Sequence, residues 1–456
     1  MDTDRFTYKD FYMEANLPDS ALVPEPILVH FHNAPEVKDS GGIITGTTTT
    51  ITNFTPSTSL LQYDTIYIPK DIVSITSSIF SNQFTGADND CKNIHNLVFA
   101  DRPGKTCDVG TNAFSSTTSL VLTGNIYVGS GKYDCINNNG AAYFFSAYAS
   151  STTSIEMGGL IINGECSCSG GSANAYFFAA YTSAADATAS IAMDDVMING
   201  KCSCSVTGSG GAGYFFTGYA STTAASSFAN ASIAMDDVTI NAECSCSSTP
   251  AYYFSAFAST NVASSATASI LIGDVTINDK CSCSSTASSV YFFSAHSFVP
   301  PSSSLGANAS IEMGDVMING ECSCNGGGAS PYFFAAYASG PTVSPPTVSI
   351  LMGKVTINAK CSCNITGSGS LVYFFAAYAS SSARTSIEMS DVTINSECSC
   401  NSGSSGRVYF FSAYTNAAAS IVLGDVKFNT ATVTLLGNNK YFFYAVLTSS
   451  SIKSFT

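Results

Sequence analysis

Cysteine pairs are the residues of this sequence with the most chemistry to offer, because thiolates attack electrophiles, bind metals and form disulfides. Fourteen of the 17 cysteines form seven Cys-Ser-Cys pairs. A spacing of two puts both sulfurs on one face of a strand. The pairs are Cys166/Cys168, Cys202/Cys204, Cys244/Cys246, Cys281/Cys283, Cys322/Cys324, Cys361/Cys363 and Cys398/Cys400. Such regular recurrence predicts a ladder of cysteines.

Three interpretations of these pairs stay open. The first is a column of small buried hydrophobic residues, a role that free cysteine often has. It is favoured because a later stretch, "TVTL", has Val433 and Leu435 instead, one position late. The second is a set of disulfides between neighbouring strands, which lie about 4.8 Å apart and so within the reach of a disulfide. The third is a metal site, although zinc sites are typically built from C-x2-4-C pairs. We expect no metal and no cofactor.

Other polar residues give little sign of an active site. The Asp of "GDV" recurs along the chain, so we interpret it as a bend residue, and Lys354 replaces it once. His30 and His32 share a strand face in "ILVHFHN", but no acidic residue or histidine follows at a spacing that suits a metal ion. No nucleophile elbow, phosphate-binding loop, dinucleotide fingerprint or H-E-x-x-H motif occurs. The sequence therefore predicts a nonenzymatic protein without catalytic residues.

A repeated phrase positions these residues. Its frame is I-x-[MIL]-x-x-[VL]-x-[IF]-N, then usually the cysteine pair, a loop of small residues and the aromatic phrase Y-[FY]-F-x-x-[YFH]. The eight copies begin at Ile155, Ile191, Ile233, Ile270, Ile311, Ile350, Ile387 and Ile421, so the interval between starts runs from 34 (387 to 421) to 42 (191 to 233). A degenerate forerunner occupies positions 119–129 and 143–150. Such a period is typical of a protein built from stacked structural units.

Each copy is predicted to form short β-strands. Ile311 and Met313, then Val316 and Ile318, alternate with polar residues, and a period of two marks strands with one buried face. The phase slips by one residue at "GD" and again after the Asn, which predicts three short strands separated by bends. No 3.6-residue stripe survives, so helices are not expected. Length varies only in small-residue segments, which we expect to be loops.

An asparagine closes the second strand in all eight copies: Asn163, Asn199, Asn241, Asn278, Asn319, Asn358, Asn395 and Asn429. Asn tolerates the left-handed backbone conformation and so suits a bend. In a stack of coils these side chains would also bond to one another, which predicts a structural Asn ladder. The alternative is that "NG" and "NA" are hairpin turns, which would make each repeat an antiparallel meander.

The aromatic phrase appears nine times, from Tyr143 to Tyr441, and predicts stacked rings in the core. His296 takes the place of the third aromatic residue once. The alternative, which stays open because adjacent residues of a strand point to opposite faces, is that one of the two Phe columns lies on the surface or between subunits. An exposed aromatic stripe would be a surface on which sugars stack.

The composition narrows the class of protein. Of the 456 residues 45% are apolar, enough for a continuous core, and only 11% are charged. The net charge of −15 without a basic cluster makes nucleic acid a poor partner. No window of 18 apolar residues occurs, so no membrane span is expected. The start lacks a standard signal peptide, so an extracellular surface or virion location would be reached by another route, such as cytoplasmic assembly.

The short strands, the "VxIN" bend, the small polar loop and the period of roughly 40 residues resemble the parallel β-helix repeats of bacterial surface adhesins and of phage tail fibres or spikes. The resemblance covers residues 119–446 and implies an all-β parallel β-solenoid of about eight to nine coils. We expect a β-rich N-terminal cap or attachment domain at residues 1–118, the solenoid at 119–446 and a C-terminal tail at 447–456 that closes the other end.

This resemblance implies a structural or adhesive protein of the fibre type. Such a protein would form a homo-oligomer or filament, or bind a glycan or cell-surface ligand, through its Ser, Thr, Asn and aromatic side chains. Two alternatives stay open. One is a polysaccharide depolymerase on the same scaffold, and the other is an eight-bladed, propeller-like module that binds proteins.

Overall fold

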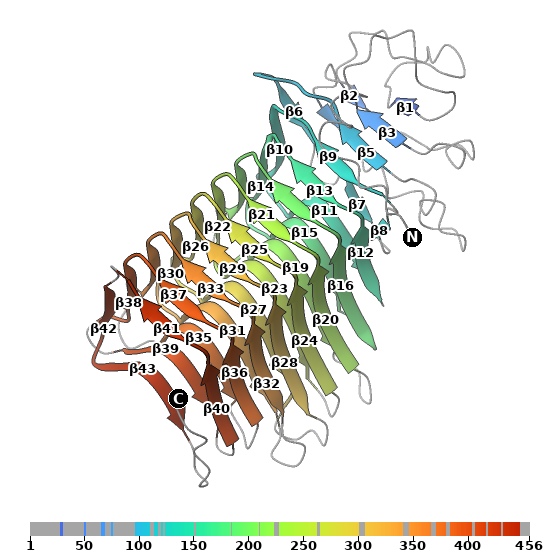
Figure 1. Ribbon diagram of the computed structural model, residues 1–456. Helices are drawn as coiled ribbons and strands as arrows, with labels where there is room; N and C mark the ends of the chain where they lie inside the picture. Colours follow the sequence, from blue (N-terminus) through green and yellow to red (C-terminus); the bar gives the residue numbers. More distant parts are fainter. Residues whose placement is uncertain are drawn as a thin grey trace, which may run out of the picture.

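The computed structural model shows an all-β protein whose chain winds into a long stack of coils (Figure 1). It describes residues 96–109 and 124–446, apart from gaps in loops, and the strand segments 28–30, 50–51, 65–68, 74–75, 114–116 and 120–121. The gaps are residues 150–151, 184, 209, 223–227, 262–264, 301–305, 341–345, 366–370, 380–383, 404–405, 416–417 and 430–431. All regular structure in the described residues is β-strand.

Four parallel sheets run along the stack, and two of them contain 12 described strands each. Sheet A holds β1 (Leu28–His30), β3 (Thr65–Ile68), β5 (Asn96–Phe99), β9 (Ile126–Val128), β13 (Leu160–Ile162), β17 (Val196–Ile198), β21 (Val238–Ile240), β25 (Val275–Ile277), β29 (Val316–Ile318), β33 (Val355–Ile357), β37 (Val392–Ile394) and β41 (Val426–Phe428). Sheet B holds β2 (Thr50–Ile51), β4 (Ser74–Ile75), β6 (Thr106–Asp108), β10 (Lys132–Asn137), β14 (Glu165–Gly170), β18 (Cys202–Val206), β22 (Cys244–Ser247), β26 (Cys281–Ser284), β30 (Cys322–Gly326), β34 (Cys361–Ile365), β38 (Cys398–Asn401) and β42 (Val433–Leu436).

The other two sheets carry the aromatic phrase and the start of the repeat. Sheet C holds β7 (Phe114–Ser116), β11 (Ala142–Ala149), β15 (Ala175–Thr182), β19 (Gly213–Thr222), β23 (Ala251–Thr260), β27 (Val290–Phe298), β31 (Pro331–Ser339), β35 (Leu371–Ala379), β39 (Arg407–Tyr414) and β43 (Asn439–Val446). Sheet D holds β8 (Leu120–Val121), β12 (Thr153–Met157), β16 (Ala187–Met193), β20 (Phe228–Met235), β24 (Ser265–Ile272), β28 (Ala307–Met313), β32 (Thr347–Met352), β36 (Arg384–Met389) and β40 (Ala418–Leu423).

Each copy of the repeat is one coil that visits sheets D, A, B and C in turn, as β16, β17, β18 and β19 do. The pairings between successive coils are parallel and place like beside like, for example Ile191 beside Ile233 and Cys204 beside Cys246. The parallel β-solenoid predicted from the sequence is therefore confirmed. A meander and a propeller blade both pair the strands of one copy with each other, so these two alternatives are wrong for the described part of the chain.

The core consists of columns that run along the axis of the stack. Ile of sheet D, Val and Ile of sheet A, both Cys of sheet B and Phe of sheet C point inward, and Ile311, Cys322 and Phe333 have no exposed surface. Because the strands pair in parallel register, each column repeats the same kind of side chain about every 4.8 Å. One hydrophobic cluster therefore extends from Leu97 to Ile421.

Both adjacent phenylalanines of the aromatic phrase face the core, as the favoured interpretation predicted, and the alternative that one Phe column lies on the surface is wrong for the described residues. Phe177 and Phe178 have no exposed surface, and their rings meet edge to face at 5.1 Å. Two successive inward side chains break the alternation of a regular strand, so the strand must bend between them. The bend leaves Tyr176 and Tyr181 on the outer face, where they belong to a separate small cluster.

Sheets A and B continue across residue 118, the expected domain boundary. β5 pairs with β9 and β6 pairs with β10, both in parallel. Leu97 and Phe99 are fully buried in the same cluster as Ile126. The cap or attachment role of residues 1–118 falls largely outside the described residues and stays a prediction, and the tail 447–456 lies outside them entirely. Within the described part of the chain, no helix is long and apolar enough to cross a membrane.

Candidate functional site

The Asn column lies at the bend between sheets A and B and faces solvent. From Asn199 onward, each side chain donates from Nδ2 to Oδ1 of the Asn one coil earlier, over 2.5 to 2.8 Å. At the start of the column, Asn163 donates to the hydroxyl of Tyr127 over 3.1 Å. The eight asparagines singled out in the sequence thus form one unbroken amide ladder along the outside of the solenoid, which ends at Asn429.

The backbone reason given for these asparagines is wrong. Asp186 is the one non-glycine residue with a positive φ in the described part of the chain, so no Asn of the ladder adopts the left-handed conformation. The backbone N–H of each ladder Asn instead donates to a carbonyl oxygen of the preceding coil. The N–H of Asn319, for example, donates to the carbonyl oxygen of Ile277 over 2.7 Å. The side chain explains the choice of Asn, because an amide both donates and accepts and can therefore continue a ladder.

We expect Asn319→Ala to lower the free energy of unfolding by about 1 to 2 kcal/mol. The change removes two amide–amide hydrogen bonds, each of which contributes roughly 0.5 to 1.5 kcal/mol. Urea denaturation followed by circular dichroism measures the loss. Thr356→Ala, on the outer face of sheet A, is the matched control and is expected to change stability by less than about 0.5 kcal/mol. Equal losses in the two variants would show that the ladder does not stabilise the stack.

Aspartates form a second ladder, at the bend between sheets D and A. Oδ1 of Asp274 accepts the backbone N–H of Asp315 over 2.7 Å, and Oδ1 of Asp315 accepts that of Lys354 over 2.7 Å. The same contact recurs at Asp195, Asp237 and Asp391, which accept from the coil that follows each of them. These carboxylates tie successive bends together, so they occupy the bend position that the sequence predicted.

The cysteine pairs point into the core as free thiols in two columns. The second column reaches the backbone of sheet C: Sγ of Cys204 lies 3.4 Å from the carbonyl oxygen of Ala175 and 3.5 Å from that of Tyr214. A thiol is a weak donor, so these contacts supply it with a partner in a dry interior. Burial raises the pKa of the Cys400 thiol far above its usual value, which keeps it protonated and unreactive at neutral pH.

Two cysteines outside the repeat frame were missed as members of these columns. Cys135 pairs in register with Cys168 and extends the second column by one coil. Cys107 lies beside Tyr133, which fills the place of the first column in that coil. Neither residue belongs to a Cys-Ser-Cys pair, but the alternation of apolar residues in "KYDCIN" carries the signal.

At the other end of the columns, Val433 and Leu435 pair directly with Cys398 and Cys400, although they follow the Asn of their copy one position later than the cysteines do. Since ordinary apolar residues continue the columns, packing is sufficient to explain the cysteines. All sixteen cysteines in the described part are unpaired thiols, and no three side chains of the metal-binding types gather there. The side chains of His30 and His32 lie outside the described residues.

The tyrosines on the outer face of sheet C form two further columns. Tyr214 stacks on Tyr252 at 5.1 Å with the ring planes 4° apart, and Tyr181 stacks on Tyr219 at 4.8 Å. The two columns touch edge to face, with 6.2 Å between the rings of Tyr214 and Tyr219. Together they cover small residues such as Ala179, which is 1% exposed. Apart from the rings at the ends, such as Tyr148, each ring in these columns has both faces against the rings of the neighbouring coils.

The stacked tyrosines differ from the expected aromatic stripe on which sugars would stack. A sugar packs on the face of an aromatic ring, whereas the columns present hydroxyls and ring edges to solvent. His296 is tilted 49° to Phe257 and 47° to Tyr337, so the stacking is least regular there. Burial lowers the pKa of His296 to about 4, and the ring is neutral at neutral pH. The columns are thus a packed part of the wall and not a series of stacking platforms.

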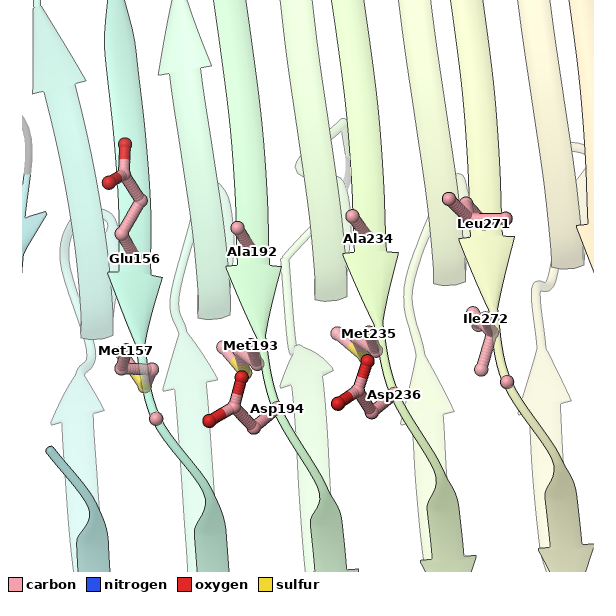
Figure 2. Close-up of a pocket in the computed structure, with 12 residues that line it drawn as sticks. Glu156, Met157, Ala192, Met193, Asp194, Ala234, Met235, Asp236, Leu271 and Ile272 are labelled. Atoms are coloured by element: carbon pink, nitrogen blue, oxygen red, sulfur yellow. The ribbon is translucent and has the colours of Figure 1, made fainter. Parts of the chain in front are cut away.

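One hollow interrupts the repetition of the outer surface. Glu156, Ala192, Ala234 and Leu271 lie side by side on β12, β16, β20 and β24 (Figure 2). The later copies carry Glu, Leu or Val at this position. The two alanines in the middle leave an open hollow of about 650 Å³.

Three carboxylates line this hollow, from Glu156, Asp194 and Asp236, and all three are exposed (Figure 2). Asp194 and Asp236 were missed in the sequence, although the signal is visible: two copies read "MDD" where the others have Gly or Ser in the place of the first Asp. The floor includes the thioether side chains of Met193 and Met235. A negative rim over an apolar floor would favour a cationic group over an anion.

The fold defines the protein as a tandem-repeat parallel β-solenoid. No family model, no curated protein and no solved structure matches this protein.

Proposed function

We propose that this protein is a nonenzymatic structural or adhesive rod, part of a fibre or appendage on a virion or cell surface, which binds glycans or further copies of itself through its repeated surface. The observation that carries the proposal is the register. The same polar side chain recurs at each coil along one axis, which builds a surface of regular rungs.

The outer face of sheet B supports this proposal most directly. The Ser between the two cysteines of each pair alternates with the buried sulfurs, and in register it is flanked by further Ser, as Ser323 is by Ser282 and Ser362. The amide ladder runs along the adjacent bend. A polysaccharide or a bundle of parallel copies also repeats along one axis, so it would engage many hydroxyls and amides at once. Weak single contacts then add up to strong binding.

Electron microscopy and binding to immobilised polysaccharides test the proposal on the purified full chain. We expect rods that bind polysaccharide or bundle side by side. Ser323→Asp combined with Ser362→Asp adds two carboxylates to the rungs of sheet B and is expected to weaken binding or bundling. The matched control, Thr356→Asp combined with Thr393→Asp, adds the same charge to sheet A. A compact particle, or equal effects of the two double variants, would contradict the proposal.

The hollow lined by Glu156, Asp194 and Asp236 favours a second candidate, a polysaccharide depolymerase, because glycoside cleavage commonly uses two carboxyl groups. A release assay for reducing sugars separates the two candidates. A nonenzymatic rod releases none from a polysaccharide that it binds. Release that disappears in Asp194→Asn combined with Asp236→Asn would support the depolymerase.

A further inference from the structure

One outward-facing row of residues beside sheet B changes the sign of its charge at every coil. It consists of the residue directly before the first cysteine of each pair and of Lys132, which lies in register beside Glu165. The lysines of this charge row are Lys132, Lys201, Lys280 and Lys360. The glutamates that alternate with them are Glu165, Glu243, Glu321 and Glu397. Thr106 and Thr432 occupy the same position in the coils at either end, so the eight charges form a bounded set.

Backbone hydrogen bonds hold the charge row in line. The N–H of each first cysteine donates to the carbonyl oxygen of the row residue in the next coil, as Cys202 does to Glu243 over 3.0 Å. The row points away from the core, because the cysteine that follows each row residue is buried. Seven of the eight row residues are exposed, and Glu243 is half-buried. Opposite charges therefore follow one another about every 4.8 Å on the outside of the solenoid.

Ion pairs within one molecule leave the charge row open to a partner. Nζ of Lys201 lies 2.9 Å from a carboxylate oxygen of Glu243, and Nζ of Lys360 lies 3.6 Å from one of Glu397. All four side chains are at least 40% exposed. Exposed pairs of this kind contribute little to stability. The alternation thus has a small effect inside one rod and presents both signs of charge to the outside.

The distribution of charge makes this row the place where two copies repel each other least. Residues 132–397 contain five lysines, and four of them belong to the charge row. Four lysines and four glutamates cancel, so the net charge of −15 lies entirely on other parts of the chain. Serines occupy the next outward position on sheet B. They are short, so the longer Lys and Glu side chains can reach a second copy first.

An even number of alternating charges is complementary to itself when its direction is reversed. A two-fold axis along the strands, between Glu243 and Lys280, places the row against the same row of a second copy. Lys132 then faces the partner's Glu397, Lys201 faces the partner's Glu321, and each of the eight charges meets its opposite. Copies that run in the same direction in register would instead place like charges together at every coil, which is unfavourable.

The outer face beside this row has the size of a small, reversible interface. Eight coils at about 4.8 Å and four residues at about 3.3 Å give a face of about 38 Å by 13 Å. Two such faces bury about 1,000 Å², at the low end for specific complexes. Contacts of this size that depend on exposed charges weaken as salt is added.

We propose that two copies of this protein pair through the charge row, with parallel axes and opposite chain directions, so that every Lys of the row meets a Glu of the partner. This inference rests on the proposed function, because it specifies how one rod contacts another.

Zero-length cross-linking of the wild-type full chain with a carbodiimide tests the direction and the register. Lys132 and Glu397 are seven coils, or about 34 Å, apart in one molecule, so an amide bond between them requires two antiparallel copies. We expect peptide mapping by mass spectrometry to find this bond and the bond between Lys201 and Glu321. The bond between Lys201 and Glu243 of one molecule is the positive control. Formation of the control bond without the other two would overturn the register.

Charge reversal tests the ion pairs, with dimerisation of the full chain measured by sedimentation equilibrium at low salt. We expect Lys201→Glu to weaken the dimer at least about tenfold, and the further change Glu321→Lys to restore it to within about threefold of the wild type. Lys201→Glu combined with Glu243→Lys is the matched control. It makes the same two changes of charge but places like charges opposite each other at both positions, so its dimer is expected to stay weak.

Equal dimerisation of the two double variants, or a wild-type chain that stays monomeric at low salt, would overturn the proposal. A monomeric rod that still binds polysaccharide would overturn the pairing alone and leave the proposed function standing. A compact particle would contradict both.

Discussion

Phe334→Ala is expected to lower the free energy of unfolding by about 3 to 5 kcal/mol, the usual range for a fully buried Phe. Phe334 has no exposed surface and stacks between Phe293 at 5.1 Å and Phe375 at 5.0 Å. Backbone hydrogen bonds hold the strands above and below in register, so the walls of the new cavity cannot collapse. Part of the loss therefore reflects the cavity itself and not the transfer of the ring to water.

Urea denaturation and amide hydrogen exchange measure this effect together. A solenoid is held by contacts between neighbouring coils, so exchange is expected to accelerate most in β27, β31 and β35. Leu351→Ala is the control, because Leu351 is 41% exposed on sheet D, and it is expected to cost less than about 0.5 kcal/mol. A similar loss in the free energy of unfolding in both variants would mean that a buried Phe of this column stabilises the protein no more than the exposed Leu351 does.

Cys324→Asp and Cys324→Val are expected to differ by several kcal/mol in the free energy of unfolding. The Cys324 thiol is fully buried and donates to the carbonyl of Tyr332 over 3.5 Å. A carboxylate at this site is an uncompensated buried charge, which costs about 3 to 5 kcal/mol. Valine keeps the apolar character and nearly the volume, so its cost is expected to stay below about 1.5 kcal/mol.

The valine variant distinguishes packing from chemistry. If the thiols held a metal ion or formed disulfides in the working protein, Cys324→Val would destabilise it about as strongly as Cys324→Asp. Ser323→Asp, on the outer face of the same strand, is the control for added charge and is expected to change stability by less than about 0.5 kcal/mol. Denaturant titrations of the three variants under the same conditions provide the comparison.

Much of the architecture was predictable because a solenoid places each residue beside its own repeat. The recurrence of the phrase and the period of two within it predicted coils of short strands, and both are present. For the same reason Asn199 was expected beside Asn163, and the two side chains are joined by a hydrogen bond of 2.8 Å. In coils with degenerate sequences the repeat frame cannot be recognised. Leu97 and Phe99 therefore fell outside the predicted solenoid although they lie in its core.

By itself, the sequence determined the parallel stack and which kinds of residue share a column, because both follow from a repeat that every copy obeys. The tertiary structure alone decided that both Phe177 and Phe178 face inward, that the tyrosine faces are covered, and that Ala192 and Ala234 open a hollow beside three carboxylates. These features depend on a bend within a strand and on side chains from other coils. Such neighbours lie a whole repeat away along the chain, so a local sequence pattern does not contain them.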